Sequence, residues 1–140
     1  MWDKRFLALT ELIATWSKDP STQVGAVVVD ADKRVVSLGY NGVPRGVEEV
    51  LDGNRNRKLL RTIHAEENAL HFAHRDLGDC TIYVSTHPCA KCAAHIIQRG
   101  IKRVVCRQED SAFYERWKES IAEAEAMFKE ANVTLIKKPH

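Results

Sequence analysis

Residues 81–107 read TIYVSTHPCAKCAAHIIQRGIKRVVCR and contain the pattern that decides the fold. The β-rich segments Thr81–Ser85 and Lys102–Arg107 each predict a strand. Between them, the sequence from about Cys89 to Gln98 predicts a helix that stops near Gly100. Two strands joined by one crossover helix run parallel to each other. This stretch therefore predicts an α/β fold with at least one parallel pair of strands.

The downstream sequence continues the same alternation. An apolar face at helical spacing predicts a long helix, and Val133–Ile136 then predicts another strand. The face consists of Phe113, Trp117, Ile121, Ala124 and Phe128. Because each strand after residue 80 is separated from the next by one helix, all three should be parallel.

The upstream sequence predicts a helix, a β-hairpin, a long connection and a second helix. Pro20 ends the first helix, because the residue before a proline is pushed out of the helical region. The hairpin strands are Val24–Asp30 and Arg34–Tyr40. A polar connection follows at Val47–Arg61, and helix formers fill His64–Arg75. The apolar face of the first helix consists of Trp2, Phe6, Leu9, Ile13 and Trp16.

These elements predict a three-layer α/β/α architecture, with a five-stranded mixed sheet and helices on both faces. At 140 residues, the chain (1–140) is expected to form a single domain. The helices that begin near His64 and near Cys89 should then start at the carboxyl end of the sheet, where open α/β folds place their active sites.

Composition excludes several classes of protein. The formal net charge of +2 gives no strong reason to expect a nucleic-acid partner. No apolar run approaches the roughly 20 residues of a membrane helix. Without a secretion signal, a cytoplasmic location is expected. A disulfide framework is then disfavoured, so Cys80 and Cys106 are predicted to be small buried apolar side chains.

Three side chains form a candidate zinc site: His64, Cys89 and Cys92. The two cysteines are three residues apart at a helix start, so both sulfurs lie on one side of its first turn. Pro88 suits the entry to that helix. The positive end of the helix dipole lowers thiol pKa values and favours the thiolates that bind metal. Three protein ligands leave the fourth position of a tetrahedral zinc for water, as in catalytic sites.

Glu66 follows the histidine by two residues and is the candidate proton shuttle. Alone, a Cys-x-x-Cys pair could be a redox pair or half of a zinc finger, and a lone histidine could be a helix cap. Together with Glu66, and with no second ligand pair elsewhere, His64, Cys89 and Cys92 favour a catalytic zinc. The combination H-x-E and P-C-x-x-C is the signature of zinc nucleobase deaminases.

The chain resembles the deoxycytidylate (dCMP) deaminase family over nearly its whole length. The clearest stretches are 17–26, 39–46, 64–70 and 88–93, which include the Gly-Tyr-Asn-Gly-x-Pro-x-Gly loop. The resemblance implies a cytidine-deaminase-like fold, a Zn²⁺ cofactor and hydrolysis of dCMP to dUMP and ammonia, which supplies dUMP for thymidylate synthesis. It also implies that Asn41, Ala65 and Asn68 bind the substrate.

The same resemblance implies regulation. Members of the family are commonly homohexamers that dCTP activates and dTTP inhibits. Gln23, Gly42, Arg45 and Gly46 are the residues that it assigns to the effector site. The family usually has a Tyr soon after an acidic residue that follows the fourth strand, but here Tyr114 comes later, so its role as a substrate contact stays open.

Several alternatives remain at this point. His87 adjoins the site and either contacts the substrate or is an exposed imidazole. Basic residues before His64 are either a solvated surface or an electrostatic funnel for phosphate groups; they are Arg55, Arg57, Lys58 and Arg61. Two rival functions are a deaminase of bases in tRNA or DNA and a non-catalytic zinc-stabilised nucleotide sensor. The low aromatic content of 7% disfavours the former, and Glu66 disfavours the latter.

Overall fold

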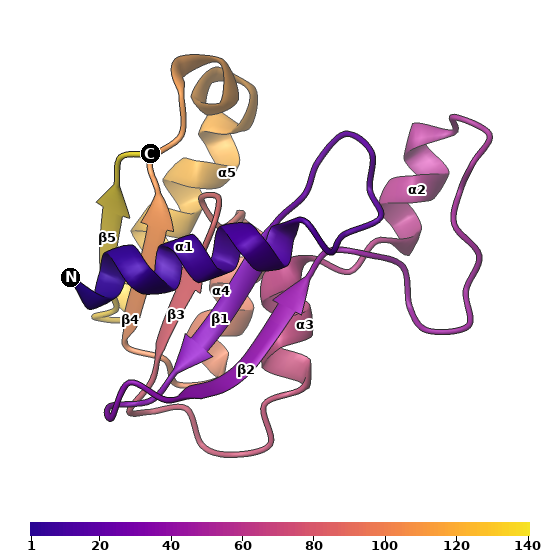
Figure 1. Cartoon of the computed structure of the whole chain (residues 1–140). Helices are drawn as coiled ribbons and strands as arrows, with labels where there is room; N and C mark the ends of the chain where they lie inside the picture. The colour runs from indigo at the N-terminus through magenta and orange to yellow at the C-terminus, as the bar shows by residue number, and fades with distance from the viewer.

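The computed structural model describes residues 1–140, and its centre is one sheet of five strands (Figure 1). The strands are β1 (Gly25–Val29), β2 (Val35–Tyr40), β3 (Thr81–Val84), β4 (Arg103–Arg107) and β5 (Thr134–Lys138). They lie in the order β2–β1–β3–β4–β5. β1 is antiparallel to both of its neighbours, whereas β3, β4 and β5 are parallel to one another. The predicted mixed sheet, with its hairpin and its parallel strands, is confirmed.

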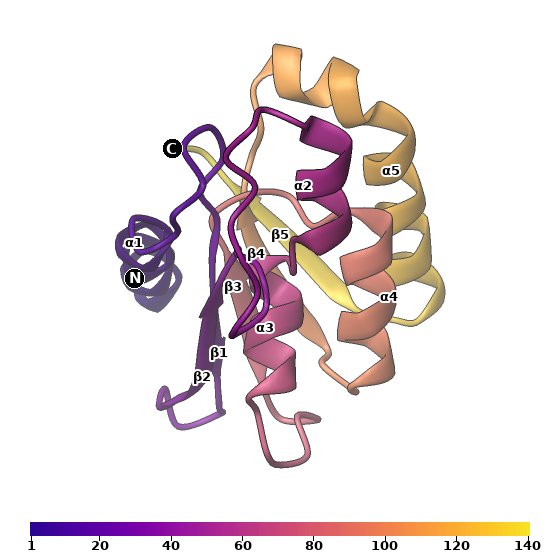
Figure 2. The same cartoon turned by 90° about the vertical axis from the view of Figure 1, so that its right-hand side faces the viewer.

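Helices cover both faces of this sheet. They are α1 (Trp2–Ala14), α2 (Arg55–Arg61), α3 (Ala65–His71), α4 (Ala90–Gln98) and α5 (Ser111–Glu130). Figure 2 shows α1 on one face and α3, α4 and α5 on the other, which confirms the three-layer prediction. None of these helices has the length and apolar character required to cross a membrane.

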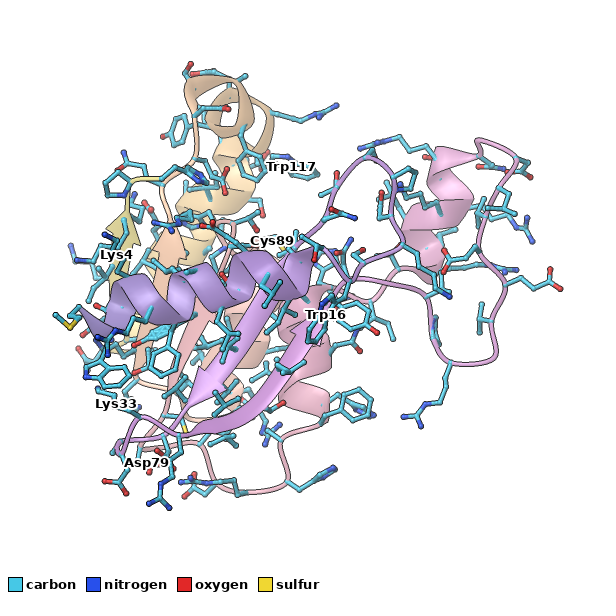
Figure 3. The ribbon with its side chains drawn as sticks, in the orientation of Figure 1. Lys4, Trp16, Lys33, Asp79, Cys89 and Trp117 are labelled. Atoms are coloured by element: carbon cyan, nitrogen blue, oxygen red, sulfur yellow. The ribbon has the colours of Figure 1, made fainter.

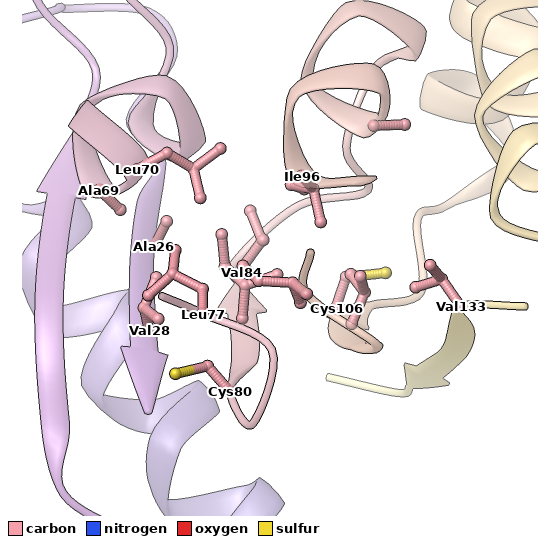
Figure 4. Close-up of a cluster of buried hydrophobic side chains, with 14 of the residues drawn as sticks. Ala26, Val28, Ala69, Leu70, Leu77, Cys80, Val84, Ile96, Cys106 and Val133 are labelled. Carbon is pink, nitrogen blue, oxygen red and sulfur yellow. The ribbon is translucent and has the colours of Figure 1, made fainter. Parts of the chain in front are cut away.

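The larger part of the core lies between the sheet and α3, α4 and α5 (Figure 4). Alternate residues of the strands face this side, among them Val28 of β1, Val84 of β3 and Cys106 of β4. They pack against Leu70 of α3 and Ile96 of α4. Cys80 and Cys106 are buried and form no disulfide, as predicted for small apolar side chains.

The smaller part of the core lies under α1, and here the predicted helix face is partly wrong. Phe6 and Ile13 are buried as expected, but Leu7 is also fully buried, whereas Trp2 and Trp16 are 45% and 50% exposed. Thr10 and Ala14 complete the buried face. The helix ends at Ala14, so Trp16 lies outside it and packs edge-on against Tyr40.

Two glycines on neighbouring strands explain how closely helices approach the sheet. A Cβ on Gly25 would lie 2.1 Å from the Thr10 carbonyl oxygen of α1. A Cβ on Gly39 would lie 2.5 Å from both the Ala65 carbonyl oxygen and the Ala69 nitrogen of α3. Because both obstructions are backbone atoms, only glycine permits α1 and α3 to pack at these distances.

Two further segments differ from the expected pattern. The first half of α5 extends past the sheet, so Phe113 is only partly buried and Trp117 is 40% exposed, whereas Ile121, Ala124 and Phe128 are buried (Figures 1 and 3). The connection at 47–61 contains α2, which has no buried residue. In Figure 1, α2 stands away from the three layers.

Candidate active site

The three predicted metal-binding side chains meet at the start of two helices. His64 is the N-cap residue of α3, Cys89 is the N-cap residue of α4, and Cys92 lies in the first turn of α4. The Nδ1 atom of His64 is 3.2 Å from the sulfur of Cys92 and 3.6 Å from the sulfur of Cys89. In Figure 3, Cys89 lies at the carboxyl end of the parallel strands β3 and β4, as predicted.

This cluster fits a zinc ion in donor chemistry and in size. The possible ligand atoms of His64, Cys89 and Cys92 all lie within 4.8 Å of one another. In a tetrahedral site, Zn–N bonds of about 2.1 Å and Zn–S bonds of about 2.3 Å place nitrogen and sulfur about 3.6 Å apart. The distance from His64 to Cys89, 3.6 Å, equals this value, and the distance to Cys92, 3.2 Å, is somewhat shorter. One imidazole with two thiols is a donor set that zinc favours.

The electrostatics of the cluster favour one thiolate even before metal binding. A hydrogen bond from the Cys92 thiol lowers the pKa of Cys89 to about 4. The same interaction raises the pKa of Cys92. The hydrogen bond to Cys89 raises the pKa of His64 to about 8. Metal binding at neutral pH therefore has to displace protons from His64 and Cys92.

Glu66 lies beside the cluster and is buried, with 4% of its surface exposed. Burial raises the pKa of its carboxyl to about 7, with smaller opposing contributions that include a hydrogen bond involving Cys92. An acid with a pKa near neutrality can both accept and release a proton at physiological pH. The arrangement thus joins a metal-binding cluster to a proton carrier.

Asn41, a predicted substrate residue, is buried and joins two loops. Its Oδ1 accepts a hydrogen bond from the Val24 amide at 2.9 Å, and its Nδ2 donates to the Thr22 carbonyl at 2.9 Å. The Ser17 hydroxyl donates to the Asn41 carbonyl at 2.8 Å. One Nδ2 hydrogen remains for another partner, because an amide carries two. Asn41 therefore fixes the loop that precedes β1 as well as lying near the end of β2.

The other two predicted substrate residues belong to α3. Ala65, which lies between His64 and Glu66 in the sequence, is fully buried. The Nδ2 atom of Asn68 donates to the Tyr40 carbonyl at 2.8 Å, which ties α3 to the last residue of β2. Together with the close approach at Gly39, this contact fixes α3 against the hairpin.

The four predicted effector residues lie in the two loops around Asn41. The Gln23 side chain donates to the Ser17 carbonyl at 2.8 Å. Gly42 forms a two-hydrogen-bond bridge with Ile63, directly before His64. Arg45 lies over the ring of Phe72, and Gly46 has a φ of +81° that favours glycine.

Most of the basic residues before His64 have partners within the chain. Lys58 forms a 2.8 Å ion pair with Asp19, and Arg57 forms a 3.7 Å pair with Asp52. The guanidinium of Arg61 donates to the Glu48 carbonyl. Because only Arg55 lacks such a partner, this cluster mainly ties α2 to its surroundings.

His87 is buried, so the alternative that it is an exposed imidazole is wrong. It is 6% exposed; its Nδ1 lies 2.8 Å from the Pro88 carbonyl and its Nε2 3.1 Å from the Glu125 carboxylate. Burial of this ring was not evident from the sequence, because its partner Glu125 is 38 residues away. Tyr114 is 44% exposed near the start of α5, and no hydrogen bond joins it to the site.

One supporting residue, Glu67, was missed although its signal is local. Glu67 accepts a hydrogen bond from the His64 amide at 3.0 Å, which is part of a capping box at the start of α3. Glu three residues after an N-cap is the capping-box position, so the sequence carried this information.

Comparison with known proteins places the chain in a family. The family model for the cytidine and deoxycytidylate deaminase zinc-binding region matches residues 1–108. The chain is 50% identical over 133 residues to an uncharacterised deaminase of Aliivibrio fischeri, with coverage of 94% of this chain and 90% of the relative. It is 38% identical to the deoxycytidylate deaminase of Mus musculus, with coverage of 97% and 79%. The human deoxycytidylate deaminase is 40% identical, and the chain covers 63% of its length.

Solved structures agree with this assignment. The dCMP deaminase of cyanophage S-TIM5 in complex with dCMP and dUMP superposes with a TM-score of 0.76 at 25% identity, covering 96% of this chain and 94% of that one. A structure from a study of tRNA:A34 deaminases shares the fold, with a TM-score of 0.62 at 22% identity. The chain is thus a deaminase that belongs to the zinc-binding cytidine and deoxycytidylate deaminase family.

Proposed function

We propose that this chain hydrolyses dCMP to dUMP and ammonia, with zinc held by His64, Cys89 and Cys92. The observation that carries the proposal is Glu66, a buried acid with a pKa raised to about 7 beside a cluster that fits zinc. A purely structural metal site has no use for such an acid. Relatives named deoxycytidylate deaminase, and a similar structure that contains dCMP and dUMP, support the choice of substrate.

In the proposed reaction, bound zinc would supply Lewis acidity that makes water a nucleophile at neutral pH. The Glu66 carboxylate accepts the first proton from that water and transfers it to N3 of the cytosine ring. Glu66 then carries the second proton to the amino group on C4, which leaves as ammonia. The C4–N bond breaks and a C4–O bond forms, so dCMP and water become dUMP and ammonia.

Substrate binding is assigned to Asn41, Ala65 and Asn68. Asn41 retains one amide hydrogen beyond its bonds to Thr22 and Val24, and this hydrogen is suited to a sugar or base oxygen. Ala65, the residue between His64 and Glu66, offers backbone groups at the start of α3. Asn68 lies one turn farther along that helix.

The variant Glu66→Gln tests the chemistry. Loss of the proton carrier should reduce dCMP turnover by at least about 100-fold while zinc content stays unchanged. Glu130→Gln is the matched control, because Glu130 is an exposed acid at the end of α5. Normal ammonia release by Glu66→Gln, measured alongside zinc by elemental analysis, would show that the proton pathway is wrong.

A comparison of substrates separates the proposal from its rivals. We expect turnover of dCMP, and none of adenosine in RNA or of cytosine in single-stranded DNA. Deoxycytidine, which lacks the phosphate, measures how much the phosphate contributes. Editing of either nucleic acid would favour the rival deaminase, and zinc binding without ammonia release from any substrate would favour a nucleotide sensor.

We also propose that residues 1–140 act as one domain in a homohexamer that dCTP activates and dTTP inhibits. The assigned effector residues are Gln23, Gly42, Arg45 and Gly46. The support is their connection to the site: Gln23 and Gly42 lie on the two loops that Asn41 joins. Turnover measured with and without each nucleotide, together with the mass of the assembly, tests this proposal; an unresponsive enzyme would contradict it.

A further inference from the structure

The helix that carries both thiols lacks a cap from its own sequence. Cys89 occupies the N-cap position of α4, but its sulfur belongs to the metal cluster and makes no capping hydrogen bond. The first amide of the helix, that of Ala90, instead donates to the hydroxyl of Ser120 at 2.9 Å. Ser120 lies on α5, thirty residues farther along the chain, so a neighbouring helix satisfies this amide.

Two other contacts hold the residues just before Cys89. The His87 amide donates to the Glu109 carboxylate at 2.8 Å. The buried His87 ring lies between the Pro88 carbonyl and the carboxylate of Glu125, at 2.8 Å and 3.1 Å. Glu125 also accepts a hydrogen bond from Lys137 of β5 at 2.7 Å. Residues 87–90 are therefore held at three points by the segment 109–125.

These contacts have a direct consequence for ligand geometry. The backbone of residues 87–90 determines where the Cys89 sulfur lies relative to Cys92 and His64. Metal sites depend on such outer contacts, and their loss commonly costs 10- to 100-fold in metal affinity. The first turn of α4 would otherwise be free to fray, because its leading amide would have no partner in the protein.

We propose that Ser120 and Glu125 of α5 are positioning residues for the two thiolate ligands. Ser120 fixes the first turn of α4, and Glu125 fixes the approach to it through His87. Neither residue touches the substrate or the reacting atoms. The inference rests on the proposed ligand role of Cys89 and Cys92.

Zinc affinity of the purified 140-residue chain, measured by competition with a chromophoric chelator, is the test. Ser120→Ala should bind Zn²⁺ about 10- to 100-fold more weakly than wild type, and the thiolate-to-metal band of its Co²⁺ form should change. Ser120→Thr retains the hydroxyl and should restore both properties. Ser111→Ala is the matched control, since Ser111 is an exposed α5 hydroxyl and should have no effect.

A second pair of variants tests Glu125 in the same assay. Glu125→Ala should weaken Zn²⁺ binding, whereas Lys137→Ala removes the other partner of Glu125 and should not. If Ser120→Ala folds poorly, Glu125→Ala and Lys137→Ala still test whether α5 positions the thiolate ligands. The rate of amide hydrogen exchange at Ala90 in Ser120→Thr tests the same contact. Wild-type affinity and an unchanged Co²⁺ spectrum in Ser120→Ala and Glu125→Ala would overturn the inference. Failure of the wild-type chain to bind Zn²⁺ would instead overturn the ligand assignment.

Discussion

The two faces of the sheet are built for different tasks. On one face, the single helix α1 packs on a small apolar cluster and is anchored by charged groups: Asp3 accepts hydrogen bonds from Arg103 and from the Tyr83 hydroxyl. On the other face, α3 and α4 cover the larger cluster and begin with the metal-binding residues. The α1 face therefore contributes to stability alone, whereas the α3–α4 face contributes to stability and also positions the metal-binding residues.

This difference has a simple physical basis. The ends of α3 and α4 must be fixed to fractions of an ångström, because ligand atoms on both helices have to meet one ion. The position of α1 has no such requirement. A perturbation of the α1 face should lower the free energy of unfolding and leave zinc binding intact, whereas the same perturbation on the other face should affect both.

Removal of zinc should give the largest effect and should separate the faces. At a free zinc concentration a thousandfold above its Kd, binding stabilises the folded state by about 4 kcal/mol. Chelation should then lower the Tm by about 10–15 °C. Hydrogen exchange should accelerate most in the first turns of α3 and α4, which lose a local contact as well as global stability, and should accelerate less in α1. Equal acceleration in α1 would contradict the proposed division.

Gly39→Ala should perturb the metal-binding face. The new Cβ would meet the α3 backbone at 2.5 Å, so α3 has to move away from β2 and take His64 with it. We expect a loss of about 3 kcal/mol in unfolding free energy and a lower zinc affinity. Gly78→Ala is the control, because its nearest neighbour is a flexible side chain at 3.5 Å. Full zinc affinity in Gly39→Ala would show that the position of α3 matters less than we infer.

Gly25→Ala should make the matching perturbation on the α1 face. Its Cβ would meet the Thr10 carbonyl at 2.1 Å and displace α1. A destabilisation of about 2–3 kcal/mol is expected, with zinc affinity unchanged under conditions in which the protein is folded. Chemical denaturation and chelator competition measure the two quantities. Loss of zinc in this variant would break the comparison.

Acid titration of the Asp3 anchor should give the smallest effect. The hydrogen bond to Arg103 lowers the pKa of Asp3 to about 2, from 3.8. The anchor therefore stabilises the fold above pH 4, and its contribution disappears as the pH falls from about 4 toward 2. Asp3→Asn should cost about 1 kcal/mol at pH 7, since the pair is partly exposed, and progressively less in acid. An exposed control, Asp32→Asn, should show no such trend.

The faces also differ in how far the sequence predicted them. The parallel strands and the set His64, Glu66, Cys89 and Cys92 were predictable, because periodicity and ligand spacing are local signals. The buried side of α1 was not, since its orientation depends on close packing over Gly25. Leu7 is buried for that reason, although Leu9 fits a regular apolar stripe equally well.

Other features escaped prediction because they have no local pattern. α2 buries nothing, so it leaves no apolar stripe inside the connection at 47–61. The burial of His87 depends on Glu125, and the cap of α4 depends on Ser120, both of which belong to a helix far along the chain. Long-range polar contacts of this kind appear only when the helices are placed side by side.

The bridge between Gly42 and Ile63 closes residues 43–62 at their base. Leu51, near the tip of this loop, is 91% exposed. Gly53, two residues later, has a φ of +78°, and no atom lies within 4 Å of where its Cβ would be. Doubling the length of a flexible loop raises its closure free energy by only about 0.6 kcal/mol. We therefore expect an insertion at this exposed tip to cause little loss of stability. The enzyme thus offers an attachment point for tags or reporter domains, separated from the chemistry by a pair of hydrogen bonds.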